Sequence, residues 1–132
     1  MKRLSRMVAA AGLALTALAT AAGAARLSPE AQLEKLVAGR AAGKPVDCIN
    51  LRDVQNQTII DKTAIVFRIG SKLYVNRPSG GANQLDNDDI LITKTFGSQL
   101  CRIDTVRLLD RASRIPHGFV SLGDFVPYTK PR

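Results

Sequence analysis

The spacing of the β-branched runs after Cys48 limits the fold most. Short runs alternate with Gly, Asn, Asp and Pro, which leaves no room for helices between them. The strand candidates are residues 63–69, 72–76, 90–96, 99–103, 105–109 and 119–128. Closely spaced strands without intervening helices favour antiparallel pairing. Residues 46–132 are therefore predicted to form a mainly β (or α+β) domain, either a small antiparallel barrel or a rolled sheet of five to seven short strands.

The clearest pair of runs, 63–69 and 72–76, is joined by Gly70 and Ser71. Glycine in the first position suits a two-residue hairpin turn, which would pair Phe67 with Tyr74. The apolar faces instead favour Phe67 opposite Val75, which needs a three-residue loop. A slip of one residue turns every side chain to the other face. We therefore expect the hairpin and leave its register open. Residues 77–89 and 110–118 are expected to be polar loops.

One short helix is expected over residues 28–38. Ser28 suits the N-cap and Pro29 the first helical turn. Leu33, Leu36 and Val37 follow at helical spacing and would form the stripe that docks the helix. Residues 40–45 are rich in Ala, Gly and Pro, so residues 25–45 are interpreted as a short helix and a linker.

Residues 1–24 have the pattern of a secretory signal. A basic start (1–6) precedes an apolar run (7–22), and small residues then offer cleavage after Ala21 or Ala24. The apolar run would extend about 24 Å as a helix, short of a bilayer core of about 30 Å, which disfavours an uncleaved anchor. We expect cleavage near Ala24, a periplasmic or secreted mature chain, and no transmembrane span within it.

The chain has two cysteines, Cys48 and Cys101. After export they would meet an oxidising compartment, where one intrachain pairing is possible. Closing a loop of about 54 residues would stabilise the fold by roughly 4 kcal/mol in the chain-entropy model. We predict a structural disulfide; two buried free thiols are the alternative. A redox role is disfavoured because no C-x-x-C spacing is present.

A pattern of residues extends over about 80 positions of the mature part of the chain, at 48–49, 59–61, 65–67, 73–77, 100–101, 104 and 122–127. In this pattern the chain resembles a group of small exported proteobacterial proteins of unknown function. Members of that group often carry two further cysteines, near Ala82 and Val120, which this chain lacks. By analogy, their joint absence supports pairing Cys48 with Cys101. The resemblance implies export and the limits of the domain, but no activity.

Few residues could carry catalysis. One histidine and two cysteines exclude zinc fingers, iron–sulfur clusters and c-type haem attachment, so no cofactor is expected. The histidine, His117, is predicted to lie in a solvated loop; a catalytic role would need a nearby nucleophile or carboxylate, with Asp104, Asp110 and Ser113 close in sequence.

Two further clusters have structural explanations. The acidic run 86–89 lacks EF-hand spacing and is interpreted as a turn rather than a metal site. Gly80-Gly81 lacks the rest of a phosphate-binding loop.

Four arginines lie close together in the sequence: Arg102, Arg107, Arg111 and Arg114. Without residues 1–24 the chain keeps 16 basic and 11 acidic residues, a net charge of +5. The arginines could bind anionic envelope lipid or polymer, or could simply form a solubilising face. Export and only six Phe and Tyr residues argue against nucleic acid.

The sequence thus favours an exported envelope protein that acts as a non-enzymatic binding or structural module. Its expected partners are anionic envelope components or another exported protein. A basic-surface binder is the first alternative, and a small hydrolase using His117 or aspartates is the second.

Overall fold

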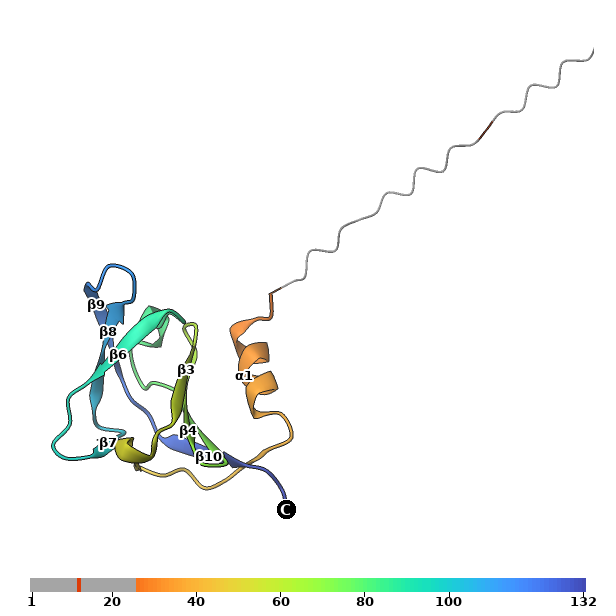
Figure 1. Cartoon of the computed structure of the whole chain (residues 1–132), viewed down its shortest axis with the longest axis horizontal. Helices are drawn as coiled ribbons and strands as arrows, with labels where there is room; N and C mark the ends of the chain where they lie inside the picture. Colours follow the sequence, from red (N-terminus) through yellow and green to blue (C-terminus); the bar gives the residue numbers. More distant parts are fainter. Residues whose placement is uncertain (1–11, 13–25) are drawn as a thin grey trace, which may run out of the picture.

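The computed structural model describes Gly12 and residues 26–132 (Figure 1). Apart from Gly12, the predicted export signal lies outside these residues. The helical elements are α1 (Pro29–Val37) and two 3-10 turns, η1 (Leu51–Asp53) and η2 (Ala82–Gln84). The strands are β1 (Ala41–Ala42), β2 (Cys48–Asn50), β3 (Asn56–Ile60), β4 (Ala64–Ile69), β5 (Lys72–Asn76), β6 (Asp89–Thr93), β7 (Gln99–Cys101), β8 (Thr105–Asp110), β9 (Pro116–Ser121) and β10 (Phe125–Thr129).

The strands of the described residues form three antiparallel sheets, in the orders β1-β10-β5-β4-β3, β2-β7 and β6-β8-β9. The predicted mainly β fold with one N-terminal helix is confirmed. The sheets roll around a shared core without closing into a barrel. Among the described residues there are ten strands rather than five to seven, since the run 119–128 divides into β9 and β10 and the sequence does not predict β1, β2 or β3. β1, β2 and the polar half of β3 show no alternation of apolar and polar residues.

Strand β4 is buried on both of its faces. Ile65 and Phe67 point into the main core, where the Phe67 ring lies 5.8 Å from the ring of Phe125. Ala64 and Val66 point the other way, into a second cluster that includes Leu33 of α1. The described domain is therefore layered: a helix, the five-stranded sheet, and the two smaller sheets on the far side (Figure 1).

Burial on both faces also decides the register of the β4–β5 hairpin. Phe67 pairs with Tyr74, as the two-residue turn requires, and Gly70 adopts a left-handed φ of +60°. The apolar-face argument for Phe67 opposite Val75 fails because α1 covers the other face of the sheet. Val75 packs there, opposite Val66.

The helix begins as predicted. The Ser28 hydroxyl accepts a hydrogen bond from the Ala31 N–H at 3.2 Å, and Leu33 is buried against the sheet. The expected linker is partly ordered into the sheet, since Ala41 and Ala42 pair with Thr129 and Tyr128 of β10. No helix among the described residues is long and apolar enough to cross a bilayer.

The disulfide prediction is confirmed: Cys48 of β2 is bonded to Cys101 of β7, 53 residues further along. The two cysteines are also register partners in this small sheet. Immediately after β2, the Leu51 N–H donates to the Ser98 carbonyl at 2.8 Å. The disulfide, together with this hydrogen bond, thus fixes the position of η1 relative to the chain before β7.

Candidate functional site

Strands β3 and β6 face each other across an open seam between the large sheet and the three-stranded sheet. Each is an edge strand, β3 of the large sheet and β6 of the three-stranded one. The seam is closed at one end, where the Lys62 N–H donates to the Leu85 carbonyl at 3.1 Å and the Asn87 N–H donates to the Asp61 carboxylate. Away from that end the two strands diverge (Figure 1).

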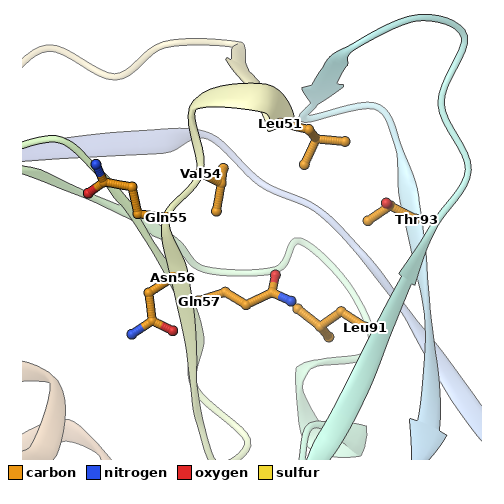
Figure 2. Close-up of a pocket in the computed structure, with 7 residues that line it drawn as sticks. All are labelled: Leu51, Val54, Gln55, Asn56, Gln57, Leu91 and Thr93. Carbon is orange, nitrogen blue, oxygen red and sulfur yellow. The ribbon is translucent and has the colours of Figure 1, made fainter.

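The diverging strands enclose a groove of about 470 Å³. This volume falls in the usual range of small-ligand sites, about 300–1,000 Å³. The side chains of Gln57 and Leu91 point toward each other from opposite walls (Figure 2). The lining combines apolar side chains, amides and one hydroxyl, from Leu51, Val54, Gln55, Asn56, Gln57, Leu91 and Thr93. None of these seven residues carries an ionisable side chain, so the groove suits uncharged ligands.

A smaller cavity of about 330 Å³ contains the histidine. His117 Nε2 lies 2.6 Å from Oδ1 of Asp89, whose side chain is only 2% exposed against 37% for His117. The hydrogen bond to Asp89 raises the pKa of His117 above its ordinary value, and the charges of Asp89 and the nearby Asp110 and Asp86 add to this effect. The pair ties the start of β6 to the start of β9.

The prediction that His117 lies in a loop is wrong, because it belongs to β9. Pro116 and Gly118 resemble loop residues, but β9 is an edge strand, where proline is tolerated. A bulge between Leu108 and Leu109 of β8 accommodates this end of β9. The partner Asp89 was missed because its 28-residue separation from His117 is bridged only by the register of three strands.

In this cavity Ser113 is hydrogen-bonded to Asp110. The Ser113 hydroxyl donates to Asp110 at 2.8 Å, and the Ser113 N–H donates to the same oxygen at 2.7 Å. These bonds lower the pKa of Asp110 and shape the turn after β8. Among the described residues no hydrogen bond joins Ser113 to His117. Asp104, also close in sequence, accepts the Cys101 N–H at 2.7 Å instead.

The structure spreads the four arginines along β8. Arg107 lies within that strand, Arg102 precedes it, and Arg111 and Arg114 follow it. Six residues of strand span about 20 Å, and β8 lies between Arg102 and Arg111. Both also have acidic partners: Arg102 lies 3.4 Å from Asp47 and from Asp124, and Arg111 lies 3.2 Å from Asp88.

The acidic run forms a turn before β6. The Asp86 N–H donates to Asp89 Oδ2 and the Asp88 N–H donates to Asp86 Oδ1, both at 3.0 Å. Across Gly12 and residues 26–132, no three His, Cys, Asp or Glu side chains gather as metal ligands. Gly81 has φ +76°, and a Cβ there would come within 2.5 Å of the Phe119 carbonyl, so close packing against β9 explains this glycine.

Comparison with known proteins adds no relative: no family model, curated protein or solved structure matches the chain.

Proposed function

We propose that this protein is an exported, non-enzymatic binding module that holds its ligand in the groove between β3 and β6. The observation that carries the proposal is the groove itself. It is large enough for a ligand, yet its seven lining residues include no acid, base or charged group. Thr93 is its only hydroxyl, and no base lies in the lining to activate it. Such a lining supplies apolar contact and amide hydrogen bonds, which suit binding rather than catalysis.

Two features support export to the periplasm or beyond, with cleavage near Ala24. The first is the charged, apolar and small-residue order of residues 1–24. The second is the Cys48–Cys101 disulfide, a bond that persists in oxidising compartments. The ligand is therefore an envelope component or another exported protein.

The same proposal includes membership of the exported proteobacterial family that the sequence resembles. That family often has cysteines near Ala82 and Val120. In this chain η2 packs against β9, and the neighbouring Gly80 bridges Ser121. The two regions thus lie together, which is where a second disulfide would have to form.

Site-specific photo-cross-linking in cells tests the binding proposal. Benzoylphenylalanine is placed at Gln57, in the groove, and as a control at Thr105, an exposed position on β8. We expect an adduct from position 57 that is absent at 105 and is lost when Thr93→Lys puts a charge into the groove. Equal adducts at both positions, or none at 57, would contradict the proposal.

A further inference from the structure

We propose that the groove receives an extended, uncharged peptide segment of another polypeptide, which adds as a strand to the edges of β3 and β6. This inference rests on the binding function proposed above and names the class of ligand. It follows from the backbone of the two edge strands together with the side chains between them.

The first step is to compare the edges of the two larger sheets. Strand β1 has only two residues. Strand β9 starts at a proline, and its outer side is occupied: the Phe119 N–H donates to Gln84 Oε1 at 3.3 Å and the Ser121 N–H donates to the Gly80 carbonyl at 3.0 Å. By contrast, β3 and β6 have five residues each and, within the described residues, pair on one side only.

The second step is that neither β3 nor β6 carries the usual protection of an exposed edge. Natural edges are blocked by lysine, proline, bulges, inward charges or a covering segment. Strand β3 (Asn56–Ile60) has no charged residue and no proline. In β6 (Asp89–Thr93) the one charge, Asp89, is bonded to His117. Unpaired N–H and C=O groups on such edges are ready to accept another strand.

The third step is the chemistry between the edges. Amide side chains both donate and accept hydrogen bonds, as a peptide group does, and Gln57 extends one of them across the groove toward Leu91 (Figure 2). Leu51, Val54 and Leu91 offer apolar contact for the alternate side chains that an added strand directs into the groove. A charged side chain would find no partner in this lining, so the segment is uncharged where it enters.

The fourth step concerns the source of the strand. A second copy of this chain has four further edges to offer, but β1 has two residues, β2 and β7 have three each, and the outer side of β9 is covered. A segment of about five extended residues, reaching about 17 Å, would match the length of β3 and β6. The occupant is therefore an unpaired extended segment of a different polypeptide.

Selection from a phage-displayed library of linear 12-residue peptides tests this inference. The disulfide-bonded protein is the target, and the selected peptides are titrated against the wild type, Thr93→Lys and Thr105→Lys. The same substitution thus enters the groove in one variant and an exposed position on β8 in the other. A second titration uses the wild type and two forms of each peptide. One form is N-methylated at the odd-numbered residues and the other at the even-numbered residues, and these two patterns are called the two phases.

The inference expects uncharged, β-branched-rich peptides whose Kd rises at least tenfold with Thr93→Lys and stays within twofold with Thr105→Lys. One phase of N-methylation should weaken binding at least tenfold, because it removes the backbone donors that pair with the edge. Binding that tolerates both phases, or a peptide bound as a helix, would overturn strand addition. Sedimentation showing that the protein pairs with itself through β3 or β6 would also overturn it.

The proposed function can fail separately. If no peptide is selected but the Gln57 adduct contains a non-peptide ligand, strand addition is overturned and the binding module stands. If neither peptide nor adduct is found, both proposals are overturned.

Discussion

The four edges of the two larger sheets form two contrasting pairs. At β1 and β9 the edge is shortened, begins with proline or is covered by Gln84 and Gly80. At β3 and β6 the edges are longer and unprotected, and they face each other across the groove. The chain thus applies the common protective devices at one pair of edges and omits them at the other. Under the function proposed above, this difference is the mark of a binding seam rather than of an unfinished barrel.

The largest expected effect comes from removing the disulfide, which anchors the strand before η1 at the open end of the groove. In the double variant Cys48→Ala/Cys101→Ala, the free energy of unfolding should fall by about 4 kcal/mol, because a 53-residue separation is no longer cross-linked in the unfolded chain. Urea denaturation measures the change. Reduction of the wild type is the control and should give a similar loss. A change below about 1 kcal/mol would show that the bond does not hold this region together.

The next effect tests how Asn76, at the end of β5, holds Gly123 in the connection between β9 and β10. Asn76 is fully buried; its Nδ2 donates to the Gly123 carbonyl at 2.7 Å and its Oδ1 accepts the Gly123 N–H at 3.0 Å. Asn76→Ala leaves two backbone groups without partners and should cost about 3 kcal/mol of stability. Asn83→Ala, at an exposed position, is the control and should stay within about 0.5 kcal/mol. Similar losses in the two variants would contradict the stabilising role of the Asn76–Gly123 hydrogen bonds.

A smaller effect is expected from a substitution that opens the protected edge of β9. Gln84→Ala removes the acceptor of the Phe119 N–H and should cost about 1 kcal/mol. It should also increase self-association through β9, as sedimentation velocity over a range of concentrations would show. Gln99→Ala, at an exposed position of β7, serves as the control. A Gln84→Ala protein as monomeric as the wild type would mean that this cover is not what protects β9.

The smallest effect is the pH dependence of the pair that joins β6 to β9. The bond to Asp89 raises the pKa of His117 in the folded state, so its stabilisation is complete below the unfolded pKa of about 6.5. The stabilisation is lost as the pH rises through the higher folded pKa. The difference in unfolding free energy between the wild type and His117→Gln should therefore shrink from pH 5.5 to 8.5. A difference in unfolding free energy that is constant or grows with pH would contradict a stabilising His117–Asp89 pair.

The sequence could predict the features that depend on local chemistry. Ser28 and Pro29 marked the helix start, and Gly70-Ser71 correctly favoured the two-residue turn. The apolar-face argument at the same hairpin failed because nothing local shows that α1 covers one side of β4. Strand β3 was missed for a related reason: its Asn, Gln and Thr residues belong to a strand only because β4 pairs with them.

The candidate site could not be predicted, because it lies between the unpaired edges of β3 and β6, two strands that are far apart in the sequence. Gln57 and Leu91 are 34 positions apart, and neither residue type indicates binding. The His117–Asp89 pair likewise exists only through the register of β6, β8 and β9. Amide side chains in β3 indicate a binding groove only when the topology shows that β3 is an edge strand facing the unpaired edge of β6.

Amide hydrogen exchange of the free protein, resolved by residue, tests the central contrast most directly. We predict that alternate amides of β3 and β6 exchange as fast as solvent-exposed groups, since their outer sides have no partner in the described fold. The Phe119 and Ser121 amides of β9 should exchange much more slowly, because Gln84 and Gly80 accept them. Uniformly slow exchange along β3 and β6, or equally fast exchange at Phe119 and Ser121, would contradict the account.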